Sequence, residues 1–131
     1  MGLVLACDEL GRAASYLEDL VHVEDPWDPL EMRLKLARNA IHSATKEIET
    51  GERTSSEFVN RLNDTRAAAW VRRVIENIDQ VGIRNLKTAN AGKLDSDVAH
   101  NFREELVSLR SMLAGTLLII EARTPAEPAT V

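Results

Sequence analysis

The sequence is poor in the residues that build disulfide-stapled or aromatic-rich folds. It has one cysteine, four prolines and six glycines, and only 4% of its 131 residues are aromatic. The single cysteine, Cys7, excludes an internal disulfide, so we expect a reducing compartment and predict a cytoplasmic protein. The apolar run at 112–120 is too short to span a bilayer, and we therefore expect no membrane segment.

Negative charge predominates, but it is unevenly distributed. The formal net charge is −5. Residues 1–31 hold eight acids and one base, a net charge of −7, whereas residues 61–93 hold seven bases and three acids, a net charge of +4. An acidic chain is a poor candidate for binding duplex nucleic acid over its whole surface, because phosphate contacts require Lys and Arg. A local basic patch within 61–93 is still possible.

Apolar residues make up 44% of the chain and recur at alternating spacings of four and three. This is the period of an amphipathic helix, and the abundant Ala, Leu, Arg and Glu all favour helices. The clearest series are Leu3, Cys7, Leu10, Ala14, Leu17 and Val21; Leu30, Leu34, Ala37, Ile41, Ala44 and Ile48; and Ala99, Phe102, Leu106, Leu109, Leu113, Thr116 and Ile120. A less regular series begins with Phe58, Leu62 and Ala69 and shifts to Val71, Val74, Ile78 and Val81. The sequence therefore predicts four helices around one core.

Polar and helix-breaking residues set the expected boundaries. The first helix should end before "EDPWDP", where Asp28 can cap the second helix, and Gly51 should stop that helix. We expect the third helix over 55–81 with Thr54 as its cap, a loop over 82–94, and the last helix from Asp95 or Ser96. The prediction is an all-α, antiparallel up-down four-helix bundle, with one domain over 1–123 and a disordered tail at 124–131.

Such a bundle brings the start of the first helix and the end of the fourth to the same end. Both segments carry more apolar residues than one core-facing series requires. The surplus residues are Val4, Leu5, Met112, Leu117, Leu118 and Ile119. A surplus in two elements at one end predicts a partner, and a symmetric homodimer is the commonest solution. The alternative is a thicker core at this end.

Arg38 and His42 lie four residues apart on the second predicted helix, with Asn39 directly after the arginine. This arrangement resembles the HEPN ribonucleases, small all-α proteins in which an arginine and a histidine form the active site. The resemblance implies that His42 would act on the 2′-hydroxyl or the leaving group while Arg38 holds phosphate. The other interpretation places both residues beside the core-facing series, with the arginine stem lying over apolar neighbours.

A basic stretch on the third predicted helix offers a second possible site. Arg66 and Arg73 are seven residues apart and share a helical face, with Trp70 between them. Arginines beside an aromatic ring can bind phosphates and stack a base, which is typical of single-strand binding. The alternative is a tryptophan in or near the core with solvated or ion-paired arginines around it.

The remaining polar residues form no recognisable metal or cofactor motif. His22 and His100 each follow an aspartate by three residues, a spacing that without further carboxylates indicates solvated side chains. We therefore expect no metal and no cofactor. The favoured hypothesis is a non-enzymatic regulatory protein that acts by protein–protein interaction, as an adaptor, an inhibitor or a subunit. The alternatives are a metal-independent ribonuclease using Arg38 and His42, and a nucleic-acid-associated subunit using Arg66, Trp70 and Arg73.

Overall fold

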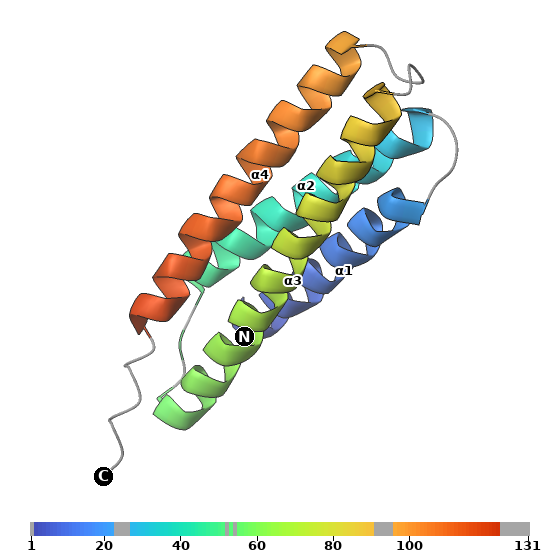
Figure 1. The fold of residues 1–131 in the computed structure, drawn as a ribbon. Coiled ribbons are helices and arrows are strands. Elements are labelled where there is room, and N and C mark those ends of the chain that lie inside the picture. The colour runs from blue at the N-terminus through green and yellow to red at the C-terminus, as the bar shows by residue number, and fades with distance from the viewer. Residues whose placement is uncertain (1, 23–26, 52, 54, 91–95, 124–131) are drawn as a thin grey trace.

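The fold is an all-α bundle of four helices, seen in a computed structural model of the chain (Figure 1). The structure describes the backbone of residues 2–22, 27–51, 53, 55–90 and 96–123, and the side chains of residues 5–20, 32–51, 53, 55–84, 97 and 99–123. The helices are α1 (Gly2–His22), α2 (Trp27–Thr50), α3 (Glu57–Asn90) and α4 (Ser96–Arg123). The predicted fold class is confirmed, whereas the predicted tail at 124–131 lies outside the described residues. Over the described residues, none of these helices could cross a membrane.

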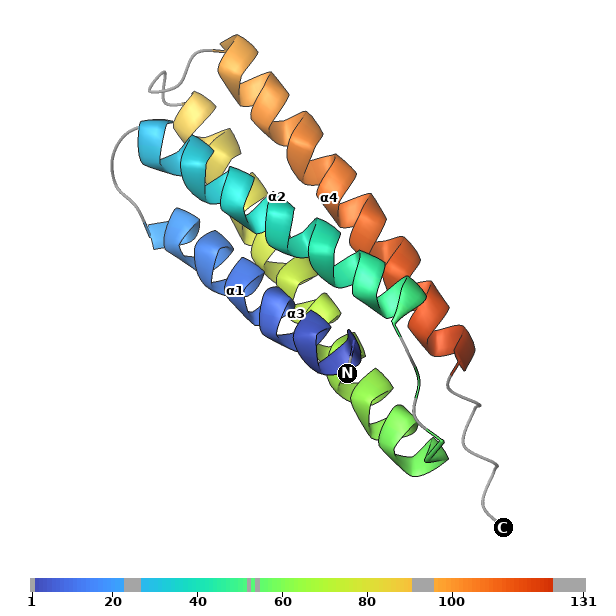
Figure 2. The same cartoon turned by 180° about the vertical axis from the view of Figure 1, so that it is seen from behind.

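The helices run up, down, up and down, but consecutive helices are not always neighbours. α1 packs on α2 and α3, and α4 packs on α3 and α2. The order around the bundle is therefore α1, α2, α4, α3, and the connection from α2 to α3 joins helices on a diagonal (Figures 1 and 2). As a result α1 and α3 are parallel neighbours, and so are α2 and α4.

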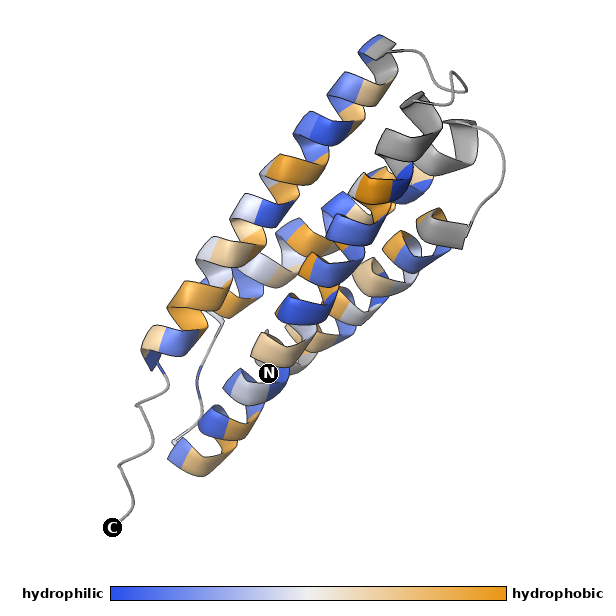
Figure 3. Ribbon diagram, viewed as in Figure 1, coloured by the Kyte–Doolittle hydropathy of each residue, from blue (hydrophilic) through white to orange (hydrophobic). Residues whose placement is uncertain are grey.

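The core follows the predicted series on α2 and α4 closely. Every member of those series whose side chain is described is buried, from Leu34 to Ile48 on α2 and from Ala99 to Ile120 on α4. α1 buries Ala6, Leu10, Ala13, Ala14, Leu17 and Leu20, whereas Cys7 is only half-buried. Many of the buried residues on α1, α2 and α3 are alanines, and such small side chains allow helices to approach closely. Figure 3 shows apolar and polar residues alternating in bands along the coloured parts of the helices.

The core-facing side of α3 differs from the prediction in its first half. Its buried residues are Asp64, Ala67, Ala68, Val71, Val74, Ile78 and Val81. Phe58 and Leu62, predicted as core, are 76% and 41% exposed, and Ala69 is exposed as well. The buried series has regular heptad spacing once Asp64 is included. Asp64 puts a carboxylate at a position where the heptad pattern requires an apolar residue. The prediction therefore followed the larger apolar residues instead, and these lie on the outer face of α3.

Both ends of α3 also differ from the prediction. Ser56 caps the helix, because its hydroxyl accepts the Val59 backbone N–H at 3.3 Å, whereas the predicted cap Thr54 lies outside the described residues. The helix continues to Asn90 through the predicted loop. A glycine inside a helix costs only about 1 kcal/mol, so Gly82 weakens α3 without ending it. Arg84 holds the extension by donating to the Leu20 carbonyl of α1 at 2.8 Å.

In each parallel pair, an arginine of one helix donates hydrogen bonds to carbonyls in the last turn of the other. Arg84 of α3 binds the last turns of α1, and Arg123 of α4 donates to the Ile48 and Glu49 carbonyls of α2 at 2.6 and 3.3 Å. Carbonyls in the last turn of a helix have no partner within it and carry the negative end of the helix dipole. Cationic side chains from the parallel neighbours therefore fix the register of both pairs.

The first turns of α3 project beyond the rest of the bundle (Figures 1 and 2). Arg72 of α3 contacts Glu121 of α4, and α4 ends at Arg123, so residues of α3 before Trp70 lie past the end of α4. α1 runs parallel to α3 with Gly11 beside Trp70, so its first residue, Gly2, is level with Arg61. The start of α3, which we call the projecting segment, therefore extends past the described ends of both α1 and α4.

Candidate functional site

Arg38, one member of the hypothetical catalytic pair, is engaged by a carboxylate of α4. Arg38 lies on the side of α2 that contacts α4, and its Nη1 is 3.0 Å from Oε1 of Glu105. Their side chains are 40% and 31% exposed, so the contact is partly shielded from water. His42 is exposed. The guanidinium that the ribonuclease hypothesis assigns to phosphate already has a carboxylate partner, which an incoming phosphate would have to displace.

The structure brings Trp70 and Arg73 into contact. The six-membered ring of Trp70 lies 3.7–3.9 Å from the position of a Cβ on Gly11, and the side chain is half-buried against the core. The Arg73 guanidinium carbon lies 5.5 Å from the centre of the Trp70 ring, a cation–π contact, and Nη2 of Arg73 is 4.0 Å from Glu18. Trp70 therefore anchors α3 to α1, while Arg66 is exposed on the same side.

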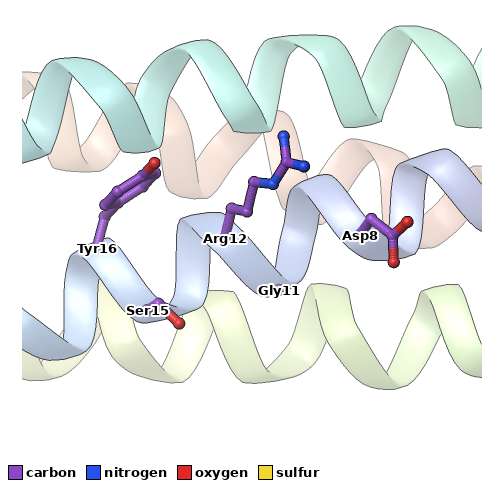
Figure 4. Close-up of a pocket in the computed structure, with 5 residues that line it drawn as sticks. All are labelled: Asp8, Gly11, Arg12, Ser15 and Tyr16. Atoms are coloured by element: carbon purple, nitrogen blue, oxygen red, sulfur yellow. The ribbon is translucent and has the colours of Figure 1, made fainter.

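A hollow of about 410 Å³ opens on the outer surface of α1, where Gly11 lacks a side chain. Its lining residues are Asp8, Gly11, Arg12, Ser15 and Tyr16 (Figure 4). Arg12 and Tyr16 extend toward α2, whereas Ser15 extends toward α3, so the polar groups diverge. Arg12 is also bonded to Glu9 at 3.2 Å. Binding sites for small molecules are concave with convergent polar groups, and this shallow hollow has the opposite arrangement.

Asp64 is the feature that sequence reasoning missed. Its side chain is 1% exposed, and both carboxylate oxygens accept hydrogen bonds from Arg53, at 3.1 and 2.8 Å. The hydrogen bond to Asp64 also raises the pKa of Arg53. Arg53 belongs to the connection between α2 and α3, so the ion pair ties that connection to the core-facing side of α3. The pairing joins residues from two elements, and the heptad pattern of α3 gives no sign of it.

The six residues predicted to form a dimer interface have different environments. Met112 and Leu117 are half-buried and pack against the core, which is the alternative that the sequence had left open for them. Ile119 is half-buried, and the side chain of Val4 lies outside the described residues. Leu5 and Leu118 are 54% and 67% exposed. Because α1 and α4 occupy one diagonal of the bundle, Leu5 and Leu118 belong to separate surfaces.

The projecting segment of α3 carries an apolar group of its own. Phe58 is 76% exposed, Leu62 41% and Val59 38%. At 3.6 residues per turn, Phe58, Leu62, Thr65 and Ala69 lie in one line along the outer face of the helix, and all four are exposed. We call these four residues the outer stripe. Its spacing of four, three and four is that of a helix-packing seam, yet no described helix covers it.

Metal and thiol chemistry receive no support from the described side chains. Within that part of the chain, no group of three or more His, Cys, Asp and Glu residues could hold a metal ion. Burial raises the pKa of the Cys7 thiol, and the neighbouring Asp8 carboxylate raises it further. A nucleophilic cysteine requires the opposite shift, because the thiolate is the reactive form. Cys7 is therefore a half-buried packing residue.

Comparison of the chain with protein-family models, with curated proteins and with solved structures finds no match. Of the surfaces described, the projecting start of α3 is the one that groups exposed apolar side chains on a helix.

Proposed function

We propose that this chain is a non-enzymatic helical protein that acts by binding another protein, as an adaptor, an inhibitor or a subunit of a larger assembly. The observation that carries the proposal is the group of exposed apolar side chains at the projecting start of α3, formed by Phe58, Val59 and Leu62. These residues lie within about two turns of one helix. Phe58 and Val59 lie beyond the described ends of α1 and α4, and Leu62 lies on the outer face of α3.

These exposed side chains forgo the stabilisation that burial would give them. Burying a phenylalanine or leucine side chain completely is worth about 1.5–3 kcal/mol relative to exposing it. A single exposed apolar residue needs no explanation, but a contiguous group of exposed apolar residues is typical of an interaction site. Aromatic residues are enriched in protein interfaces, so we expect Phe58, at one end of the proposed surface, to contribute the largest share of the binding energy.

The ribonuclease hypothesis remains a rival with a direct test. It requires Arg38 to leave Glu105, 3.0 Å away, and to bind phosphate beside His42. Under our proposal, the purified protein leaves structured and unstructured RNA intact without added metal. Cleavage that is abolished by Arg38→Ala or by His42→Ala would replace the proposal with catalysis.

The homodimer predicted from the sequence also stays a proposal. The chain still offers Leu118, 67% exposed on α4, as a contact for a second copy. Leu5 belongs to a different surface, at the start of α1, so we now expect any contact between copies to use one of these residues and not both. A cytoplasmic location, proposed from the single cysteine, is compatible with either assembly.

The decisive experiment is site-specific photo-crosslinking in the native host. A photo-reactive phenylalanine analogue is placed at position 58, and a matched control carries it at Val107, which is 54% exposed on α4. We expect position 58 to give a discrete crosslinked protein partner, and expect Leu62→Asp in the same chain to remove it. Equal crosslinking from both positions, or none from position 58, would contradict the proposal.

A further inference from the structure

The charges beside the outer stripe define the chemistry of its partner. At 100° per residue, Arg61 lies on one side of the line from Phe58 to Ala69, and Arg66 lies on the other. Both arginines are exposed. Among the described residues, no ion pair involves either guanidinium. The one acid between them, Asp64, is buried and neutralised by Arg53.

The polar group inside the stripe does not require a partner. The Thr65 hydroxyl donates to the Arg61 carbonyl at 2.9 Å, so covering it leaves no donor without a partner. Farther along α3 the next two arginines are already engaged, Arg72 with Glu121 at 3.2 Å and Arg73 over Trp70. The available surface is therefore short, about 16 Å from Phe58 to Ala69 at 1.5 Å per residue. Its centre is apolar apart from Thr65, one exposed arginine lies on each side, and the exposed Glu57 lies one turn before Arg61.

We infer that the outer stripe docks an amphipathic helix of another protein whose apolar seam is flanked by Glu or Asp. This inference rests on the proposed function and names the partner class for the same surface. The heptad spacing selects a helix, because knobs from one helix fill the spaces between residues four and three apart on the other. The two arginines then select acidic flanks by charge complementarity.

A second copy of this chain fits the stripe less well. A symmetric pair of stripes would be either parallel or antiparallel, and each arrangement sets a basic flank against a basic flank. Arg61 and Arg66 would then meet arginines of the second copy, which is unfavourable. Single-stranded nucleic acid would satisfy the arginines but would leave Phe58, Leu62 and Ala69 without a matching apolar seam.

The test uses three designed helical peptides of three heptads, with a fluorescent label and at concentrations below their self-association. The first has leucine at its seam and glutamate on both flanks, the second has lysine on the flanks, and the third keeps the glutamates but has a scrambled seam. Fluorescence anisotropy measures the affinity of the full chain for each. We expect the first peptide to bind best, with the lysine version about tenfold weaker or more.

Variants assign the binding to the stripe. Phe58→Asp should weaken binding of the glutamate-flanked peptide by about 30-fold or more, the size expected for the loss of a buried aromatic contact. The double variant Arg61→Glu, Arg66→Glu should reverse the preference toward the lysine-flanked peptide. The matched controls are Val107→Asp and Arg103→Glu, two exposed positions on α4, and they should leave all affinities unchanged. Circular dichroism of each variant confirms that the bundle is intact.

Each other outcome overturns the inference in a distinguishable way. Equal binding of the acidic and basic peptides through Phe58 would leave the proposed function standing and refute the acidic partner. Concentration-dependent dimerisation lost in Phe58→Asp would assign the stripe to a second copy. RNA binding that is lost in the arginine variant and kept in Phe58→Asp would assign it to nucleic acid. Binding of no peptide would refute the inference, while crosslinking from position 58 would still decide the proposed function.

Discussion

Replacing Arg53 by alanine should destabilise the bundle more than any other single change of a surface arginine. The substitution leaves the Asp64 carboxylate, 1% exposed, without the two hydrogen bonds at 3.1 and 2.8 Å that it now accepts. Losing one partner of a fully buried ion pair costs about 3–5 kcal/mol. Arg53 is itself 34% exposed, so water can reach part of the vacated space. We therefore expect a loss of about 2–3 kcal/mol in the free energy of unfolding.

Removing both charges should have the opposite effect. In Arg53→Met, Asp64→Leu the leucine completes the heptad series from Asp64 to Val81 on the buried face of α3. Replacing a buried ion pair by apolar residues of similar volume is neutral or stabilising by about 1–4 kcal/mol. The double variant should therefore be at least as stable as the wild type, even though Arg53→Ala is not.

Urea unfolding followed by far-UV circular dichroism measures both effects. The matched control is Arg110→Ala, which removes an ion pair of similar geometry, 2.9 Å from Asp79, on an exposed surface. Exposed ion pairs contribute little to stability, so the control should resemble the wild type. The reasoning would be refuted if Arg53→Ala were no more destabilising than Arg110→Ala, or if the double variant were the least stable of the set.

Three further predictions concern other parts of the bundle. Gly115→Ala should raise the free energy of unfolding by about 1 kcal/mol, because an added Cβ there meets no atom within 4 Å and alanine is the better helix former; a loss of stability would argue against a regular helix at that point. Leu118→Glu should convert the proposed dimer to a monomer by light scattering, whereas Val107→Glu should not; an unchanged mass would exclude Leu118 from the contact. Burial raises the pKa of Cys7 above its ordinary value of 9.0, so the folded state holds the thiol proton more tightly than the unfolded state. The free energy of unfolding should therefore fall as pH rises from about 8 to 10, and it should fall less in Cys7→Ala than in the wild type. Equal losses of stability in the two proteins would contradict the raised pKa.

The helices themselves could be predicted because the periodicity of α2 and α4 is uninterrupted. Positions such as Leu34, Ile41, Leu109 and Leu113 are buried as their spacing requires. On α3 two seams compete, one containing Asp64 and one containing Phe58. Spacing alone favours the seam with the larger apolar residues. Asp64 can occupy the core position because Arg53, which lies outside the helix, neutralises its charge.

Neighbour relations were not predictable from spacing. Heptad periodicity identifies which face of a helix is buried but does not say which helix covers it. The sequence therefore indicated four helices and their directions, but not that α1 and α4 are diagonal. That placement separates Leu5 from Leu118, and it changes the interpretation of the apolar surplus. The extension of α3 past Gly82 similarly depends on a contact with α1, through Arg84 and the Leu20 carbonyl.

At the candidate sites, too, spacing along one helix suggested pairs of residues, whereas the observed partners lie on other helices. The four-residue spacing of Arg38 and His42 suggested a catalytic pair, but the partner of Arg38 is Glu105, on a different helix. Trp70 was assigned either to stacking or to the core, and its contact with Gly11 supports the second assignment. Ion pairs and aromatic contacts between helices depend on tertiary placement, so local spacing cannot reveal them.

The most direct test of the outer stripe as a binding surface is a titration of the ¹⁵N-labelled chain with the glutamate-flanked peptide, followed by amide chemical shifts. Our account predicts that the largest shifts occur in the first turns of α3, at Phe58, Leu62, Thr65 and Ala69, and that they are absent in Phe58→Asp. It also predicts no comparable shifts around Arg38. Shifts centred on the α2–α4 side near Arg38, or shifts at the outer stripe that persist in Phe58→Asp, would contradict it.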